Sequence, residues 1–229
     1  MKSKLLLTAL SIFICVAVSN AQSLIRFYEN AKVGYKDESG KVVVPAKYVA
    51  GSDFSEGFAL VIEKNKRGFI DATGKVVIPF EYDDASVFKS GVARVMKNGK
   101  YGYISSSNVA VIPFQYDVAF DFSQGLARVK QNGKWAYIDA TGNNVTQFIY
   151  DEANDFAEGL ASVKMNGKWG FINQKGEIII PFKYELAYNF GNKVCMVQKG
   201  DKFYEINSNG KVIREIEMRE GEEMEKGKK

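Results

Sequence analysis

Arginine, tryptophan, aspartate and cysteine side chains recur in this sequence at positions where they could carry chemistry. Histidine is absent from all 229 residues. Its absence excludes Ser-His-Asp and Cys-His catalysis, the HExxH zinc motif and an imidazole pH switch. We therefore predict no catalytic set, no metal site and no cofactor.

Carboxylates are the remaining candidates for catalysis. Asp71, Asp139 and Asn173 share one position relative to the surrounding pattern. Two carboxylates that flank a glycosidic bond suffice for hydrolysis, so a glycan-acting hydrolase is an alternative. Each of these residues stands just before a turn, where aspartate commonly accepts hydrogen bonds from the backbone that follows. We predict the turn role, and we do not expect an enzyme.

Two arginines and two tryptophans are the candidate binding residues. Arg94 and Arg128 lie 34 residues apart on strands, in a register that we expect to face outward. There they could meet a polymer that carries carboxylate or phosphate groups, or simply be solvated. Trp135 and Trp169 could stack on sugars, but we expect them to cover glycine and to fill gaps between sheets.

Cys195 has a structural explanation. It falls in a register otherwise occupied by alanine, which predicts a small, inward-facing position. Cys15 is the other cysteine and lies in the segment that we expect to be removed. A lone thiol forms no internal disulfide, so the domain is expected to depend on packing for its stability.

A repeat of 34 residues organises the rest of the chain. Lysine, glycine, proline, tyrosine and phenylalanine each recur at this step. The lysines are Lys32, Lys66, Lys100, Lys134, Lys168 and Lys202. The phenylalanines are Phe54, Phe88, Phe122, Phe156 and Phe190, and we expect these connector aromatics to pack between units. Tyrosines at the Tyr82 register are expected to bond the backbone at a connector start.

The units are predicted to be strands, although helical repeats of 34 residues exist. Asn98-Gly99, and the same pair twice more at this step, predicts two-residue hairpin turns. Helices would not tolerate four or five glycines per unit. A second turn carries glycine in most units, and Asn108 replaces it once, as the residue that best tolerates a left-handed backbone. The small residue at the Gly170 register suggests close approach of a neighbouring chain or ring.

We therefore predict an all-β tandem array of about six three-stranded antiparallel meanders. Their expected ranges are 24–44, 58–78, 92–112, 126–146, 160–180 and 194–213. One sheet buries too little by itself, so neighbouring sheets must stack. A closed β-propeller is the alternative, because six similar sheets could also form a ring.

The repeated motifs resemble a known family. Lys134-Trp135-Ala136-Tyr137-Ile138-Asp139 and 168–173 are similar to the core of the WG repeat, also called the KWG repeat. The similarity covers roughly 24–213, although valine, arginine, tyrosine or phenylalanine replaces tryptophan in the other units. The resemblance implies a bacterial β-repeat protein with a binding or scaffolding role, and it transfers no catalytic residue.

Both ends of the chain differ from the repeats. Lys2 and Lys4, the apolar run 5–18 and small residues before Ala21 predict a signal peptide over 1–21 and hence export. The run is shorter than a spanning helix needs, and we expect no transmembrane segment after cleavage. Residues 22–213 form the expected repeat domain. Residues 214–229 are expected to be a charged, solvated tail, with a short amphipathic helix as the alternative.

The sequence thus predicts an exported, non-catalytic binding or scaffold module of the cell envelope. Its expected partner is a protein or an envelope polysaccharide. A net charge of +4 is too weak and too scattered to suggest nucleic acid. The hydrolase and a purely structural envelope component are the alternatives.

Overall fold

The computed structural model describes residues 24–217, which form β-strands and the turns between them. The strands make six antiparallel sheets, numbered here in chain order. Sheet 1 contains β1 (Ile25–Glu29), β2 (Lys32–Lys36) and β3 (Val42–Tyr48). Sheet 2 contains β4 (Ala50–Gly51), β5 (Phe58–Glu63), β6 (Lys66–Asp71) and β7 (Val76–Tyr82). Sheet 3 contains β8 (Asp84–Ala85), β9 (Val92–Lys97), β10 (Lys100–Ser105) and β11 (Ala110–Tyr116). Sheet 4 contains β12 (Val118–Ala119), β13 (Leu126–Gln131) and β14 (Lys134–Asp139). Sheet 5 contains β15 (Glu152–Ala153), β16 (Leu160–Met165), β17 (Lys168–Asn173) and β18 (Ile178–Tyr184). Sheet 6 contains β19 (Leu186–Ala187), β20 (Val194–Lys199), β21 (Lys202–Asn207) and β22 (Val212–Ile216).

The predicted tandem array of meanders is confirmed, with one addition. Four of the sheets in residues 24–217 have four strands rather than three. The added strand has two residues and comes from the connector between units. In sheet 2, for example, Ala50 pairs with Ile62 and Gly51 pairs with Val61. Two residues are too few to show an alternating pattern, so the sequence indicated only a loop there.

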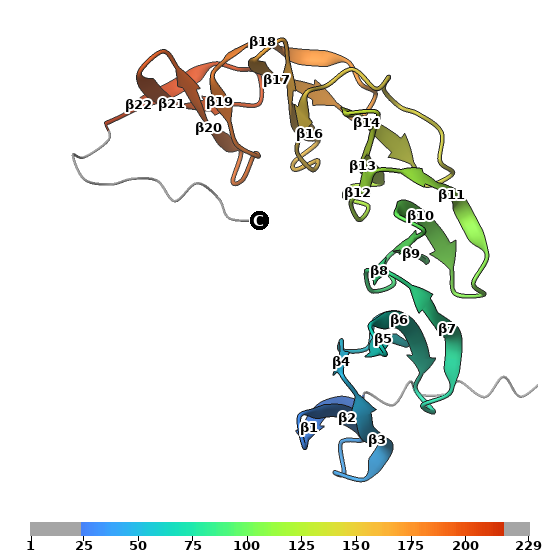
Figure 1. The fold of residues 1–229 in the computed structure, drawn as a ribbon. Helices are drawn as coiled ribbons and strands as arrows, with labels where there is room; N and C mark the ends of the chain where they lie inside the picture. Colours follow the sequence, from blue (N-terminus) through green and yellow to red (C-terminus); the bar gives the residue numbers. More distant parts are fainter. Residues whose placement is uncertain (1–23, 218–229) are drawn as a thin grey trace, which may run out of the picture.

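The six sheets follow one another along an open arc (Figure 1). Sheet 1 and sheet 6 lie at opposite ends of the arc, so the array is open and the closed propeller is not what the chain forms. The short strands β8 and β12 lie on the inner side of the arc, whereas β7 and β11 lie on the outer side.

Both predicted kinds of turn are present. Asn98 and Gly99 have φ angles of 53° and 74°, the left-handed conformation that a type I′ hairpin turn requires. In the second turn Asn108 has a φ of 60°, where the other units have glycine. The single asparagine therefore marks a backbone requirement rather than a functional site.

The outer strands bend at their prolines. The pairing of β10 with β11 shifts register on the way to Pro113. Proline is tolerated because its missing N–H lies on an edge strand. The bend brings backbone against Gly102, where a Cβ atom would lie 2.7 Å from the carbonyl oxygen of Ile112. The glycine register therefore reflects the close approach of a neighbouring strand, as predicted.

Sheet 4 departs from this pattern at both positions. Ala136 replaces the glycine and Gln147 replaces the proline. After β14 the chain forms only isolated bridges, such as that between Ile138 and Asn144, and sheet 4 has no outer strand. Because the Ala136 methyl group occupies the space into which an outer strand would bend, we attribute the missing strand to this pair of replacements.

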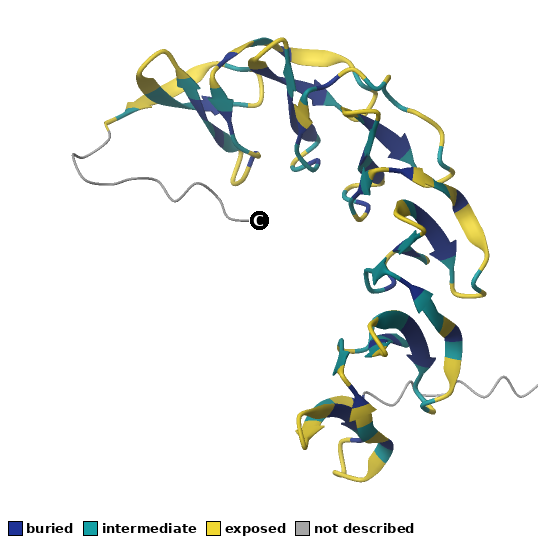
Figure 2. Cartoon of the chain, in the orientation of Figure 1, coloured by how far each residue is buried: buried dark blue, intermediate teal, exposed yellow. Residues whose placement is uncertain are grey.

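Aromatic pairs join each sheet to the next, which confirms the prediction for the connector phenylalanines. In all five interfaces the phenylalanine packs on a tyrosine or phenylalanine of the preceding sheet, with ring centroids 4.8–5.2 Å apart. The pairs are Tyr35–Phe54, Phe69–Phe88, Tyr103–Phe122, Tyr137–Phe156 and Phe171–Phe190. Figure 2 shows the buried residues along the middle of the array and exposed residues on the outer strands. The sheets are thus held by stacking, as a repeat array requires.

Charged residues cover the two end faces of the array. Lys36 occupies the register of Ile70, and in sheets 2 to 6 this register is a fully buried isoleucine. Glu205 occupies the register of Tyr35, which is a buried aromatic residue in sheets 1 to 5. The Glu205 carboxylate accepts two hydrogen bonds of 2.7 Å from Arg214. Polar outer faces on terminal repeats stop further stacking.

The last strand extends past the predicted end of the repeat domain. Strand β22 runs to Ile216, so 214–216 belong to sheet 6 and not to the tail predicted over 214–229. The bidentate pair between Arg214 and Glu205 gives the reason, because it joins β22 to β21. The predicted signal peptide over 1–21 and the rest of the tail lie outside the described residues.

Candidate functional site

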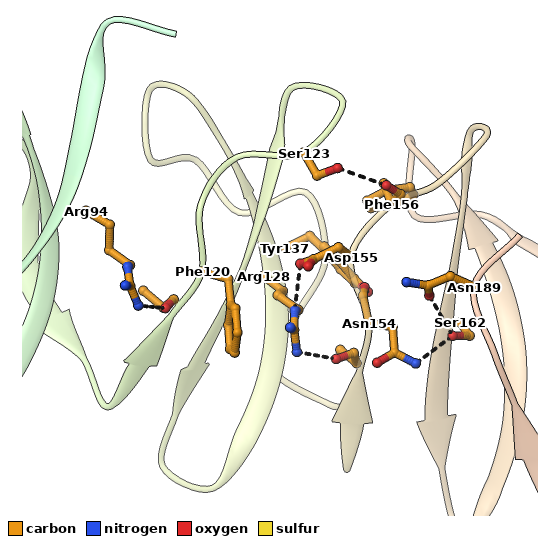
Figure 3. Close-up of polar contacts among 12 residues, drawn as sticks. Arg94, Phe120, Ser123, Arg128, Tyr137, Asn154, Asp155, Phe156, Ser162 and Asn189 are labelled. Carbon is orange, nitrogen blue, oxygen red and sulfur yellow. Dashed lines mark hydrogen bonds and ion pairs between the residues drawn. The ribbon is translucent and has the colours of Figure 1, made fainter. Parts of the chain in front are cut away.

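Arg128 lies between sheets 4 and 5 and not on an outer surface. Its Nε donates to Oδ1 of Asp155 at 2.7 Å, and its Nη1 donates to the carbonyl oxygen of Ala153 at 2.9 Å. The guanidinium lies 3.4 Å from the centre of the Phe120 ring (Figure 3). Only 16% of the side chain is exposed. Arg128 therefore joins two sheets.

Arg94 makes the same kind of contact between sheets 3 and 4. Its Nη1 donates to the carbonyl oxygen of Ala119 at 2.8 Å, and Nε lies 3.5 Å from Oδ1 of Asp121. Its side chain is 19% exposed. The prediction that Arg94 and Arg128 face outward is therefore wrong. Each inner sheet is stacked on both sides, so both faces of its strands are turned toward a neighbour.

The residue at the Arg94 and Arg128 register and the residue that it contacts in the next sheet change type together from one interface to the next. The residue 27 positions further along is aspartate whenever the register holds arginine. Arg26 follows the same rule and was missed in the sequence, with Nη1 2.6 Å from the carbonyl oxygen of Gly51 and Nε 3.4 Å from Asp53. The five pairs are Arg26–Asp53, Leu60–Val87, Arg94–Asp121, Arg128–Asp155 and Ser162–Asn189. The two positions thus hold either two charged, two apolar or two polar residues. This matched change between repeats is the sequence signal that could have revealed the contact.

The two tryptophans pack largely against other residues of the array. Trp169 is 5% exposed and belongs to the core between sheets 5 and 6. Trp135 is half-buried, with its ring 5.9 Å from that of Phe120 and with Lys130 5.5 Å above it. The structural role expected for tryptophan therefore holds for Trp169, and Trp135 keeps only part of its surface for a ligand.

Four of the six repeated lysines pair with acids 17 positions further along. The Nζ atoms of Lys100, Lys134 and Lys168 lie 2.5 Å from a carboxylate oxygen, and Lys66 pairs in the same way with Asp83. Asp117 receives both the Lys100 ammonium and the N–H of Asn132 in the next sheet's hairpin turn. The Lys100 hydrogen bond holds the pKa of Asp117 below its usual range. This register therefore links consecutive sheets through charge and backbone together.

The aspartates weighed for hydrolysis are turn residues, as predicted. Oδ1 of Asp139 accepts hydrogen bonds from the N–H groups of Thr141 and Asn143 and from the Thr141 hydroxyl, at 2.6–3.0 Å. The Thr141 hydroxyl bond holds the pKa of Asp139 below its usual range. A general acid for glycoside hydrolysis needs a raised pKa instead. Asp71 and Asn173 accept from their own turns in the same way.

One predicted tyrosine role belongs to a different register. The Tyr82 hydroxyl donates to the side chain of Asn108, not to backbone. The tyrosines that bond backbone in a connector are Tyr35, Tyr103 and Tyr137, through carbonyl oxygens at 2.5–2.8 Å. Burial raises the pKa of Tyr35 to about 12, so its hydroxyl stays protonated and can donate.

Cys195 is buried as predicted, with 2% of its surface exposed. Its thiol donates to the carbonyl oxygen of Tyr188 at 3.0 Å. Burial raises the pKa of the Cys195 thiol to about 12. A thiol that stays protonated and covered is a poor nucleophile.

Five connector turns recur once per unit, and we call them the rim. The rim consists of 55–58, 89–92, 123–126, 157–160 and 191–194, each closing the hairpin between a two-residue strand and the next long strand. The two central residues of each rim turn have positive φ. These central pairs are Glu56-Gly57, Ser90-Gly91, Gln124-Gly125, Glu158-Gly159 and Asn192-Lys193.

Rim side chains reach across to the next rim turn. Glu56 accepts hydrogen bonds from the N–H groups of Ser90 and Gly91, at 2.7 and 2.9 Å. Gln124 accepts from Gly159, and Glu158 accepts from Lys193, both at 2.9 Å. A rim turn is therefore an acceptor-binding site for its neighbour, because left-handed turns present consecutive N–H groups in one direction.

Neither a metal site nor a membrane-spanning helix emerges within residues 24–217. Histidine, cysteine, aspartate and glutamate do not gather there in threes that could hold an ion. Of the part described, no helix has the length and apolar character to cross a membrane.

Two solved structures are compared with this chain, and the first is similar at the level of the fold. A eukaryotic initiation factor is 10% identical, with a TM-score of 0.53 over 83% of this chain and 62% of that protein. Hsv2 from Kluyveromyces lactis is 10% identical, with a TM-score of 0.43 over 70% of this chain and 60% of Hsv2. The chain thus spans about three fifths of either protein. Comparison with curated protein sequences finds no match.

The family model of the WG containing repeat matches five consecutive stretches. They are residues 34–66, 68–101, 101–135, 135–169 and 169–203. These stretches follow the 34-residue step that the aromatic pairs and the lysine–acid pairs follow in the structure. The chain therefore belongs to the family of WG containing repeat proteins, as its motifs predicted.

Proposed function

We propose that this chain is a non-catalytic binding module of the cell envelope that holds a protein partner along its rim. The observation that carries the proposal is that different positions of the repeat have different roles. Recurring arginine, aromatic and lysine side chains join sheet to sheet, whereas the first central residue of each rim turn is exposed and is glutamate, serine, glutamine or asparagine, depending on the unit. An extended array with one varied edge is a common basis for recognition by repeat proteins.

A protein partner is favoured over a polysaccharide. Sugar binding usually uses exposed aromatic faces, but Trp169 is buried and Trp135 is partly covered by Lys130 and Phe120. The rim instead offers turn N–H groups that, within this chain, donate hydrogen bonds to glutamate and glutamine side chains. The signal peptide predicted over 1–21 supports a location in the envelope.

The test is capture of envelope proteins by the mature chain, residues 22–229, compared with two surface variants. The rim variant carries Lys89→Glu and Lys193→Glu. The matched variant carries Val76→Thr and Ile178→Thr on exposed outer strands. We expect a partner that the native chain and the outer-strand variant retain and that the rim variant loses by tenfold or more.

Other outcomes count against the proposal. Retention of polysaccharide and no protein would replace the ligand class. Loss of the partner from the outer-strand variant alone would move the binding surface to the opposite edge. Hydrolysis of glycan by the native chain would show an enzyme.

A further inference from the structure

The row of rim contacts is broken between sheets 3 and 4. Between sheets 2 and 3, the Ser55 hydroxyl donates to the carbonyl oxygen of Phe88, and Glu56 binds two turn N–H groups. Between sheets 4 and 5, Ser123 and Gln124 make the equivalent bonds. At the corresponding positions of sheet 3 the residues are Lys89 and Ser90. Serine is too short to reach the next turn, and lysine supplies no hydroxyl.

A third replacement widens the same place. Gln174 donates to the carbonyl oxygen of Gln124 at 3.0 Å, across a rim turn. The residue one repeat earlier is Ala140, which has no polar group to extend toward Ser90. Three short or unmatched side chains thus meet at one interface.

A hollow of about 300 Å³ lies at this interface. Its lining includes Lys89, Ser90, Phe122, Gln124, Gly125 and Ala140. Within the described chain, no side chain accepts from the N–H groups of Gln124 and Gly125, and no carboxylate pairs with Lys89. The hollow therefore combines two turn N–H groups, a hydroxyl and an ammonium group around one opening.

We infer that this hollow is a binding site for a glutamate side chain of a protein partner. Two consecutive turn N–H groups hold the Glu56 carboxylate one repeat earlier, at 2.7 and 2.9 Å. Gln124 and Gly125 present the same pair of donors, and Lys89 adds a positive charge that the internal contact lacks. Charge-assisted bonds of this kind are roughly twice as strong as neutral ones.

The neighbouring groups favour a peptide over a simple carboxylate. Val92 and Phe122 line the hollow and can contact the methylene groups of glutamate. The carbonyl oxygen of Phe122 corresponds to that of Phe88, which accepts from Ser55 one repeat earlier. A serine or backbone N–H next to the glutamate would use that acceptor. The chain's own Ser55-Glu56-Gly57 segment is thus a template for the ligand.

The inference rests on the proposed function, and its test uses a defined probe. Acetyl-Ser-Glu-Gly-amide is titrated into the full mature chain while backbone amide signals are followed by NMR. We expect shifts at Gln124 and Gly125. The amide of Lys193 serves as the internal control, because Glu158 already accepts its hydrogen bond and Lys193 does not line the hollow. Acetyl-Ser-Ala-Gly-amide should bind at least tenfold more weakly.

Ser90→Glu is the decisive variant, because it should place the chain's own carboxylate in the hollow. We expect this variant to fold, to be at least as stable as the native chain, and to lose peptide binding at least tenfold. Glutarate should bind more weakly than the peptide, and inorganic phosphate should not compete. Equal binding by Ser90→Glu, no shift at Gln124 and Gly125, or tighter binding of glutarate or phosphate would overturn the site.

The two proposals can fail separately. If a partner is captured along the rim and Ser90→Glu retains it, the binding module stands and the glutamate site is wrong. If the peptide binds as described but no envelope protein is captured, the site stands and the proposed function loses its support.

Discussion

Replacing Arg128 by leucine should destabilise the array at one interface. The change removes hydrogen bonds of 2.7 Å to Asp155 and 2.9 Å to the Ala153 carbonyl oxygen, together with contact with the Phe120 ring. Ala153 is 5% exposed, so its carbonyl oxygen loses its donor where little water can replace it. Asp155 is 41% exposed and can be solvated again. The expected loss is therefore about 2–3 kcal/mol, below the cost of breaking a fully buried pair.

The chain itself supplies the rescue. One interface uses Leu60 and Val87 at these two positions. The double variant Arg128→Leu with Asp155→Val should therefore recover at least about 1 kcal/mol relative to Arg128→Leu alone. Denaturant unfolding followed by tryptophan fluorescence measures these differences, because Trp135 lies beside the changed residue. Arg67→Leu is the control, since Arg67 donates to the carbonyl oxygen of Asn65 in its own hairpin, and should cost about 0.5 kcal/mol or less.

Two results would refute this reasoning. If Arg128→Leu is as stable as the native chain, the guanidinium does not hold the two sheets together. If the double variant is no more stable than the single variant, the pairing of the two registers has no energetic meaning.

Three further predictions follow from the fold. Gly102→Ala should lower stability by about 1–3 kcal/mol in thermal unfolding, because its Cβ would lie 2.7 Å from a carbonyl oxygen, whereas Gly191→Ala, with nothing within 4 Å, should cost much less. Lys36→Ile combined with Glu205→Tyr should make copies associate end to end in sedimentation, and a monomer at high concentration would contradict the capping role. The pKa of Asp117 is lower in the folded chain than its unfolded value of 3.8, so the Asp117 carboxylate contributes its full stabilisation above pH 3.8. This stabilisation is lost as the pH falls through the lower folded-state pKa. Asp117→Asn should therefore reduce the loss of stability at acid pH, as measured by melting at a series of pH values.

The sequence predicted most of the fold because the repeat makes local signals appear many times. Asn98-Gly99 and Asn108 identify turns through backbone conformation alone, and Phe122 shows its packing role by recurring at a fixed step. The two-residue strands were missed since Ala50-Gly51 has no pattern to detect. The repeat thus made weak local signals detectable, but it could not reveal a strand that has no local signal.

The candidate site was harder to predict, for a physical reason. Alternation along a strand separates a buried face from an exposed one only when one face meets solvent. Arg94 alternates with Ala93 and Val95, yet all three face a neighbouring sheet because sheet 3 is stacked on both sides. The hollow beside Lys89 exists because this interface lacks side chains that other repeats have at the same positions. Only the three-dimensional arrangement shows that these positions lie next to one another.

The open arc of six stacked sheets is the central claim, and small-angle X-ray scattering of the mature chain tests it most directly. An array of this shape should give an elongated, asymmetric distribution of interatomic distances that matches the arc. A compact, symmetric distribution typical of a closed ring would contradict it.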